Sequence, residues 1–152
     1  MTKIRGFEEV KSNLKKFNTE TTLPTRGTKQ SAGYDFYSKE LVTIETGNQH
    51  VFWTDVKSYM QPGEVLEMYV RSSVGIKKGL VLSNGTGIID CDYYSNESND
   101  GNIGLCLRNE SKQSQTIEVG ERIAQGIFKS FLEADNIISN TERGGGIGST
   151  NN

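Results

Sequence analysis

The chain has 152 residues, a length typical of one domain, and a formal net charge of -2. This near balance of charge argues against a nucleic-acid-binding surface, which is usually strongly basic, so no nucleic-acid partner is expected. Hydrophobic residues make up only 34% of the chain and glycine occurs 17 times. That composition indicates many turns and favours a core that is completed by oligomerisation.

The sequence has no run of about 18 apolar residues, so no membrane span is expected. The N-terminus lacks the apolar core of a signal peptide, which predicts a cytoplasmic protein. Cys91 and Cys106 are therefore expected to be reduced. His50 is the only histidine, which excludes a histidine-clustered metal site, and no zinc signature is present.

The N-terminal third gives mixed signals. Residues 1–5 could open an edge strand. Apolar side chains at Phe7, Val10, Leu14 and Phe17 fall at roughly helical spacing, which predicts a short helix. A loop is expected at residues 23–27.

From residue 33 onward, short apolar segments alternate with turn signals. The segments are 33–37, 41–44, 51–53, 56–60, 65–70, 79–82, 103–107 and 117–119. The breaks are 47–48, 62–63, 84–85, 100–101 and 120. This rhythm predicts an all-β sandwich or barrel.

The last apolar segment, 122–131, fits either a helix face or a buried strand. Gly126 and the surrounding β pattern favour the strand. The residues after Ala134 are polar and rich in glycine, and such a stretch buries too little surface to order itself. We therefore expect a β domain over residues 1–134 and a flexible C-terminal arm over 135–152.

Residues 83–94 place a Gly-punctuated turn, two isoleucines, two carboxylates and two tyrosines close together. A carboxylate in a partly apolar cleft has a raised pKa and can act as a general base on water, which is the role suggested for Asp90. The ring of Tyr93 can pack against a planar or sugar-like ligand. For both to face one ligand, the chain must turn between them. The alternative is that Asp90 and Asp92 are turn residues and Tyr93 is core.

Four further stretches carry weaker signals. Arg71, Ser72 and Ser73 follow an apolar strand and could hold phosphate oxygens, or form an ordinary polar turn. Arg143 begins a glycine-rich tail with hydroxyls, which could wrap a phosphate or be a disordered end. Asp35 follows Gly33 at a strand start, and Gln125 lies among apolar residues, where a ligand or a structural hydrogen bond could satisfy it.

Together, these five stretches resemble the five motifs of the trimeric dUTP pyrophosphatases (dUTPases). In family order they are 32–35, 71–73, 87–93, 120–125, and Arg143 with 145–150. The resemblance covers nearly the whole chain. It implies an all-β fold of the distorted jelly-roll or β-barrel type, and a homotrimer whose active sites are shared among subunits. In the family, the C-terminal arm of one chain closes a site formed by the other two.

The implied reaction is dUTP plus water giving dUMP and pyrophosphate, with Mg2+ held mainly on the triphosphate. Asp90 matches the family's general base, which activates the water that attacks the α-phosphorus. Tyr93 matches the ring that packs under deoxyribose and leaves no room for a 2′-hydroxyl. Asp35 matches the carboxylate that supports Mg2+ through water.

The remaining matches concern the base and the phosphates. Asn84, Ile88 and Ile89 match the uracil-reading edge. The matches to phosphate-binding residues are Arg71, Ser72, Ser73 and Gln125, and those to the arm's γ-phosphate contacts are Arg143, Ser149 and Thr150. Ile147 stands where most members carry a Phe that stacks on uracil. The polar run 95–102 predicts a longer loop after the third motif.

Two alternatives accompany this interpretation. A dUTPase-like trimer could serve as a regulatory protein-binding module, as some phage-type members do, in a bacterial or phage-infected cell. A related dCTP deaminase would need a Glu near the pyrimidine amino group, and no residue matches that motif. Release of ammonia from dCTP would identify the second alternative.

Overall fold

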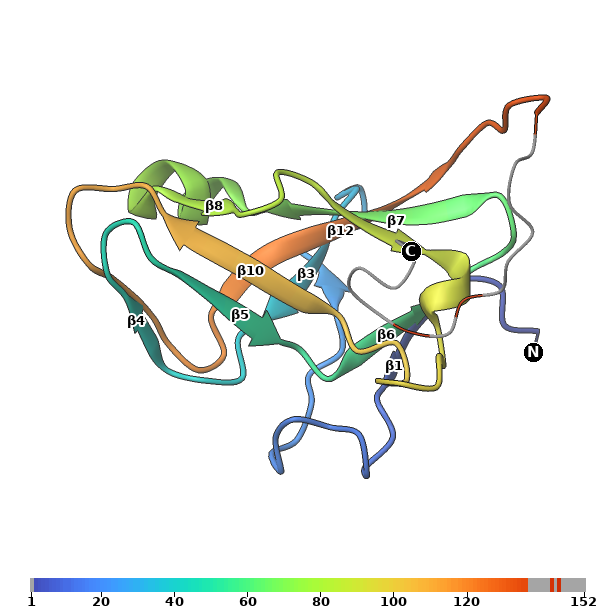
Figure 1. Cartoon of the computed structure of the whole chain (residues 1–152), viewed down its shortest axis with the longest axis horizontal. Helices are drawn as coiled ribbons and strands as arrows, with labels where there is room; N and C mark the ends of the chain where they lie inside the picture. Colours follow the sequence, from blue (N-terminus) through green and yellow to red (C-terminus); the bar gives the residue numbers. More distant parts are fainter. Residues whose placement is uncertain (1, 137–142, 144, 146–152) are drawn as a thin grey trace.

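The computed structural model describes residues 2–136, 143 and 145, and consists almost entirely of short antiparallel strands (Figure 1). Its strands are β1 (Gly6–Glu9), β2 (Thr25–Arg26), β3 (Tyr34–Tyr37), β4 (Val42–Ile44), β5 (Gln49–Trp53), β6 (Val56–Tyr59), β7 (Glu64–Val70), β8 (Leu80–Leu82), β9 (Gly87–Asp90), β10 (Gly104–Asn109), β11 (Gln115–Ile117) and β12 (Arg122–Ser130). Two short helical turns interrupt them, the π-helix η1 (Ser73–Lys77) and the 3-10 helix η2 (Cys91–Tyr93).

The strands form two larger sheets and two strand pairs. One sheet has the order β2-β3-β12-β7-β9 and the other the order β5-β10-β8, while β1 pairs with β6 and β4 with β11. Every pairing is antiparallel. The all-β prediction is therefore confirmed. In Figure 1, the β5–β10 ribbons lie in front of the longer sheet that carries β12 and β3.

The core is formed by inward-facing side chains of both sheets. Strand β10 shows the alternation clearly, because Leu105 and Leu107 are buried while Cys106 between them is only half-buried. Fully buried side chains from the other sheet complete the cluster, among them Phe36 of β3, Leu66 of β7 and Ile123 of β12. The two sheets are thus the layers of a single sandwich.

The helix predicted at Phe7–Phe17 is wrong. Phe7 lies in β1, paired with Ser58 of β6, and its ring packs 5.5 Å from that of Phe36 and 5.4 Å from that of Phe128. Only its position in a strand lets it join this aromatic cluster, so tertiary packing overrides the spacing of the apolar residues. The edge strand expected within 1–5 instead begins at Gly6.

The ambiguous segment 122–131 is a strand, as predicted. β12 is central in its sheet, between β3 and β7. A Cβ at Gly126 would lie 2.9 Å from Leu66 Cδ1, so the glycine is needed where β12 crosses the core. Other boundaries moved slightly: the segment expected at 117–119 is β11, Gln115–Ile117, and the loop expected at 23–27 contains β2.

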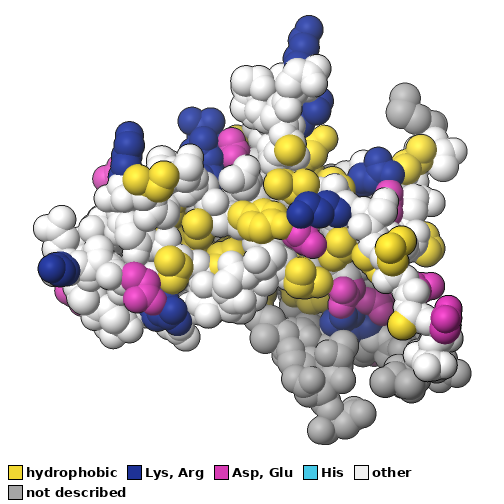
Figure 2. Space-filling model, turned by 90° about the horizontal axis from the view of Figure 1, so that it is seen from above, with side chains coloured by type: hydrophobic (Ala, Val, Ile, Leu, Met, Phe, Trp, Pro, Cys, Tyr) yellow, Lys and Arg dark blue, Asp and Glu magenta, His cyan; other side chains and the backbone are white. Residues whose placement is uncertain are grey.

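Three further properties bear on function. Among the described residues, no helix is long and apolar enough to cross a membrane. On the face seen in Figure 2, Lys and Arg side chains lie among Asp and Glu side chains rather than forming a field of one sign. Cys91 and Cys106 are both free thiols.

Candidate active site

The stretch predicted to carry the chemistry forms an edge strand followed by one helical turn. β9 pairs with β7, which places Asp90 opposite Val65. Ile88 and Asp90 are exposed, while the alternate positions are half-buried, as the two faces of a strand require. η2 turns the chain directly after Asp90, so the turn expected between Asp90 and Tyr93 is confirmed.

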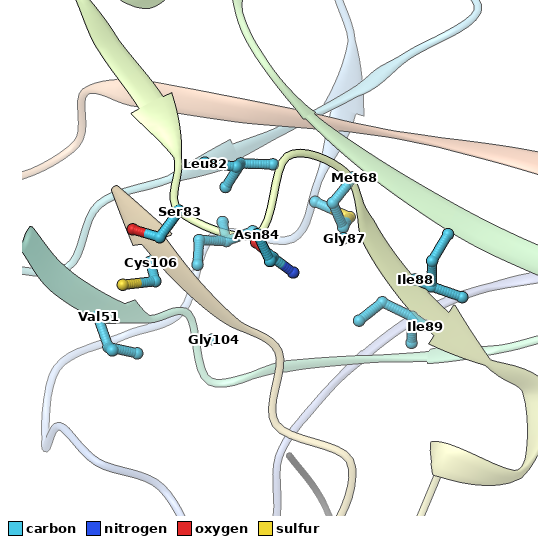
Figure 3. A pocket seen from close by; sticks show the side chains of 11 residues that line it. Val51, Met68, Leu82, Ser83, Asn84, Gly87, Ile88, Ile89, Gly104 and Cys106 are labelled. Atoms are coloured by element: carbon cyan, nitrogen blue, oxygen red, sulfur yellow. The ribbon is translucent and has the colours of Figure 1, made fainter. Parts of the chain in front are cut away.

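A cavity of about 330 Å3 opens beside this strand (Figure 3). It is lined by Val51, Met68, Leu82, Ser83, Asn84, Gly87, Ile88, Ile89, Gly104, Leu105 and Cys106. Most of these groups are apolar, and the side chain of Asn84 offers the polar contact at the turn between β8 and β9. A small pocket with apolar walls and few polar groups suits a flat, weakly polar ligand such as a pyrimidine base.

Asp90 has a different environment from the one that the sequence suggested. Its side chain is 49% exposed, so the partly apolar cleft expected for this carboxylate is not provided by the single chain. Its carboxylate Oδ2 accepts a hydrogen bond from Arg143. Arg143 also donates through Nε to Asp92 Oδ1 at 2.8 Å.

The Arg143 side chain is largely buried where it contacts Asp90 and Asp92. Its side chain is 10% exposed, and its guanidinium carbon lies 5.8 Å from the centre of the Tyr93 ring. Burial lowers the pKa of Arg143, but the hydrogen bond to Asp92 and the charges of both carboxylates raise it above its ordinary value. The guanidinium is therefore firmly charged, and it neutralises the two acidic side chains.

The Tyr93 ring is buried, and its hydroxyl has two partners. The hydroxyl donates to the Asn102 backbone carbonyl at 2.5 Å and accepts from Asn99 Nδ2 at 2.8 Å. Burial raises the pKa of Tyr93, whereas the hydrogen bond from Asn99 and the charge of Arg143 lower it. The ring is thus held at its hydroxyl, and it shares with Asp90 the neighbour Arg143.

A second group of predicted site residues surrounds Asp35 on β3. Asp35 is 6% exposed. Its Oδ1 lies 3.1 Å from Arg71 Nε, and its Oδ2 lies 3.6 Å from Arg122 NH1. A nearly buried carboxylate is therefore held between two guanidinium groups, one half-buried on Arg71 and one exposed on Arg122.

Gln125 belongs to the same group. It lies opposite Asp35 in the pairing of β12 with β3. A Cβ at Gly33 would meet Gln125 Oε1 at 2.2 Å and Gln125 Cβ at 3.0 Å. The glycine of the first motif is thus required so that the Gln125 side chain can lie across the start of β3.

Ser72 and Ser73 follow Arg71 at the start of η1. The Arg71 carbonyl accepts hydrogen bonds from the backbone N–H groups of Val74 and Gly75, which forms the first helical turn. Ser72 is exposed and Ser73 half-buried. The structure therefore brings together the predicted phosphate residues Arg71, Ser72, Ser73 and Gln125 with the predicted Mg2+ residue Asp35.

The two groups do not meet within one chain. Asp90 lies opposite Val65 near the start of β7, whereas Arg71 follows the last residue of β7. Six residue steps along a strand span roughly 20 Å. The cavity with Asp90 and the group around Asp35 therefore lie at opposite ends of one strand.

Some predicted residues lie outside the described part of the chain, namely Ile147, Ser149 and Thr150. Within the described residues, no group of three or more His, Cys, Asp and Glu side chains could hold a metal ion.

Two neighbours of the predicted residues were not anticipated, Arg122 and Asn99. Arg122 is part of the fourth motif together with Gln125, which was a usable signal, but no pattern in the sequence indicates the bond from Asn99 to Tyr93.

Comparison with known proteins agrees with this geometry. A family model described as dUTPase matches residues 19–151. The chain is 47% identical to the deoxyuridine 5'-triphosphate nucleotidohydrolase of Lactococcus lactis over 150 residues, covering 97% of this chain and 98% of that protein. The chain belongs to the dUTPase family.

Solved structures are similar in fold as well. The crystal structure of dUTPase from Streptococcus mutans is 44% identical, with a TM-score of 0.77 over 86% of this chain and 99% of that chain. The Staphylococcus bacteriophage 80alpha dUTPase is 25% identical, with a TM-score of 0.71 over 92% and 98% of the two chains. In that phage system, dUTPases control the transfer of virulence genes by a proto-oncogenic G protein-like mechanism.

Proposed function

We propose that this protein hydrolyses dUTP to dUMP and pyrophosphate with Mg2+, with Asp90 activating the water that attacks the α-phosphorus. Such an activity keeps uracil out of DNA and supplies dUMP for thymidylate synthesis. The observation that carries the proposal is the apolar cavity lined by Asn84, Ile88 and Ile89, which Asp90 and the η2 turn with Tyr93 follow directly along the chain. Membership of the dUTPase family supports the choice of substrate.

The cavity and the two residues that follow it in the chain, Asp90 and Tyr93, each have a role in this reaction. The backbone of Ile88 and Ile89, together with Asn84, reads the edge of uracil, and hydrogen-bond mismatch excludes cytosine. The buried ring of Tyr93 forms the wall under the deoxyribose. Asp90 remains half-exposed, which leaves room for a water beside its carboxylate.

Arg143 has to leave Asp90 during this reaction. While the hydrogen bond from Arg143 is made, the guanidinium occupies Oδ2 of Asp90, an oxygen that a water needs in order to pass on its proton. A triphosphate carries more negative charge than Asp90 and Asp92 and is a better partner for the guanidinium. Substrate binding thus transfers Arg143 to the phosphates and frees the base, in keeping with the role of the C-terminal arm, residues 135–152, as a lid.

The positions of the two groups support an oligomer, with a homotrimer as the specific proposal. One nucleotide cannot touch both ends of β7 in the same chain, yet the phosphates need Arg71 and the α-phosphorus needs Asp90. A symmetric assembly lets the Asp90 end of one copy face the Asp35 end of another.

Mg2+ fits this site only as a companion of the substrate. The second group offers one carboxylate, Asp35, and it is already engaged by Arg71 and Arg122. Mg2+ prefers to keep several waters and to bind through substrate phosphates, so Asp35 suits an outer contact through water. When bound, the ion would neutralise charge on the triphosphate.

Pyrophosphate release from dUTP, dTTP, dCTP and UTP, with and without Mg2+, tests the proposal. We expect strong preference for dUTP, dependence on Mg2+ and no ammonia from dCTP. Equal rates with all four nucleotides would contradict the substrate assignment, and ammonia release would favour the deaminase.

A regulatory protein partner is a second candidate function. The similarity to the bacteriophage 80alpha dUTPase and the long polar loop 95–102 favour it. A partner that occupies the active site should compete with nucleotide. A pull-down from host extract with and without the non-hydrolysable analogue dUpNHpp would show this competition, and capture that is unaffected by the analogue would argue against an active-site partner.

A further inference from the structure

We infer that Asn99, in the loop after the third motif, is a positioning residue that fixes the Tyr93 ring and thereby sharpens selection of deoxyribose over ribose. The inference rests on the proposed function, because it assigns Tyr93 to the wall under the sugar. It adds a residue and a loop for which the family motifs give no role.

The first argument is that the Tyr93 hydroxyl is bonded on two sides. It donates to the Asn102 carbonyl at 2.5 Å and accepts from Asn99 Nδ2 at 2.8 Å. A buried phenol with both a donor and an acceptor bond has a defined direction for its C–O axis. The ring can therefore neither slide nor tilt without breaking one of the two bonds.

The second argument is that Asn99 is itself held in one orientation. Its Oδ1 accepts from Asn96 Nδ2 at 2.8 Å and from the Gly101 backbone N–H at 3.0 Å. Because two donors meet at this oxygen, the amide nitrogen is the end that faces Tyr93. Asn96 Nδ2 also donates to the Tyr93 carbonyl at 2.8 Å, which ties the loop to the backbone of the same residue.

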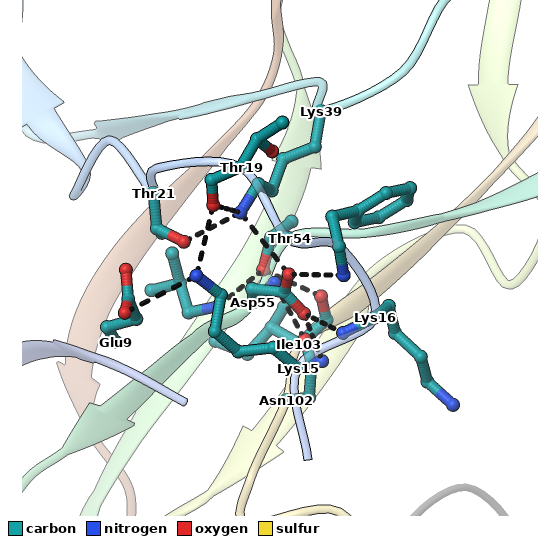
Figure 4. A network of polar contacts seen from close by, with 12 residues as sticks. Glu9, Lys15, Lys16, Thr19, Thr21, Lys39, Thr54, Asp55, Asn102 and Ile103 are labelled. Carbon is teal, nitrogen blue, oxygen red and sulfur yellow. Dashed lines mark hydrogen bonds and ion pairs between the residues drawn. The ribbon is translucent and has the colours of Figure 1, made fainter. Parts of the chain in front are cut away.

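The third argument is that the acceptor is anchored in the core. Asn102 is fully buried, and its side chain exchanges two hydrogen bonds of 2.9 Å with Asp55. Asp55 in turn accepts from the backbone N–H groups of Lys16 and Phe17 and pairs with Lys39 (Figure 4). The network therefore fixes the Asn102 carbonyl, which accepts the hydrogen bond from the Tyr93 hydroxyl.

The fourth argument concerns what covers the ring. The Arg143 guanidinium lies over the ring, on the side where Asp90 also bonds Arg143. The ring belongs to the buried core cluster. Tyr93 is only 7% exposed, so the two bonds at the phenol oxygen fix how the ring meets a sugar once Arg143 has moved to the phosphates.

The test compares kcat/KM for dUTP and UTP in Asn99→Ala and Tyr93→Phe, singly and together. One hydrogen bond is worth about a three- to ten-fold change in selectivity, so Asn99→Ala should lower the dUTP:UTP ratio by that factor. Tyr93→Phe removes the bonds to both Asn99 and Asn102 and should lower the ratio at least as much. The double variant should fall no further than Tyr93→Phe, because that change already removes the bond from Asn99. Ser98→Ala is the matched control: within the described residues the Ser98 hydroxyl donates to Asn96 Oδ1 alone, so its removal should leave the ratio unchanged.

The double variant distinguishes two effects of Asn99→Ala: loss of the bond to the Tyr93 hydroxyl, and disturbance of the loop itself. Asn99→Ala also removes the acceptor for Asn96 and Gly101, and that loss persists when Tyr93 is Phe. An unchanged ratio in Asn99→Ala, or an equal fall in the Tyr93→Phe background, would overturn the inference. If Asn99→Ala fails to fold, Asn99→Asp takes its place, because it keeps the acceptor oxygen but has no amide hydrogen to donate to the Tyr93 hydroxyl: an unchanged ratio overturns the inference and the expected fall supports it. A wild-type protein that is inactive on dUTP would overturn the proposed function as well. If the wild type is active but the dUTP:UTP ratio does not change in the variants, only the role of Asn99 is overturned.

Discussion

The two ends of strand β7 differ in the exposure of their carboxylate and in the charge around it. At its start, an edge strand leaves Asp90 half-exposed beside an apolar cavity. At its end, Asp35 is nearly buried between Arg71 and Arg122 in the middle of the same sheet. The first end suits recognition of a flat base and activation of water. The second presents fixed positive charge and suits phosphates, so each end supplies what the other lacks.

The largest expected effect is at the Asp90 end. Asp90→Asn keeps the size of the side chain but cannot accept the proton from water, so pyrophosphate release should fall roughly 10²–10⁴-fold. Binding of dUpNHpp, measured by calorimetry, should persist because the cavity is intact. Turnover at the wild-type rate would show that Asp90 is not the base.

A smaller effect is expected at the Asp35 end from Gly33→Ala. The new Cβ would stand 2.2 Å from Gln125 Oε1, which forces Gln125 off the start of β3. We expect about a ten-fold loss of kcat/KM for dUTP, comparable to the loss of one good hydrogen bond to a charged group.

Gly27→Ala is the matched control for that change. A Cβ at Gly27 would make only an ordinary contact, 3.8 Å from Ser31 Oγ. Its steady-state kinetics should match the wild type. Equal losses in the two variants would mean that the effect comes from the N-terminal segment in general rather than from Gln125.

The smallest expected effect concerns stability in acid and involves the loop that holds Tyr93. Burial raises the pKa of Asp100, but the hydrogen bonds from Lys57 Nζ and the Lys11 backbone N–H, with their charges, bring it below its ordinary value. A carboxyl whose pKa is depressed by folding stabilises the fold above its unfolded pKa of about 3.9 and loses that contribution as the pH falls further.

Urea unfolding of wild type and Asp100→Asn between about pH 3 and pH 6 measures this contribution. As the pH is lowered, the urea concentration at the unfolding midpoint should fall more steeply for the wild type than for the variant. Toward pH 6, the plots of midpoint against pH should run parallel for the two proteins. Parallel curves over the whole range would contradict the assignment of Asp100.

Local patterns were enough to predict the β fold, because turn residues such as Asn84-Gly85 separate the apolar segments. The N-terminal helix was predicted wrongly because the spacing of Phe7 and Val10 does not reveal that Phe7 packs on Phe36 and Phe128. Such contacts join residues far apart in sequence, and periodicity does not encode them.

The same limit applies to the site. The motifs identified Asp90, Arg71 and Gln125 individually, but their separation into two groups follows from the order of strands in one sheet. The bond between Asn99 and Tyr93 depends on side-chain directions within an irregular loop, which has no repeating pattern to read.

Mixing two inactive variants tests most directly whether the two ends of β7 work together across copies of the chain. Asp90→Asn and Arg71→Ala would each be unfolded, combined in equal amounts and refolded, and pyrophosphate release from dUTP would then be measured. In a shared site, random assembly pairs an intact Asp90 end with an intact Arg71 end in about a quarter of the sites, so activity should return to about a quarter of wild type. A mixture as inactive as its separate components would contradict the account.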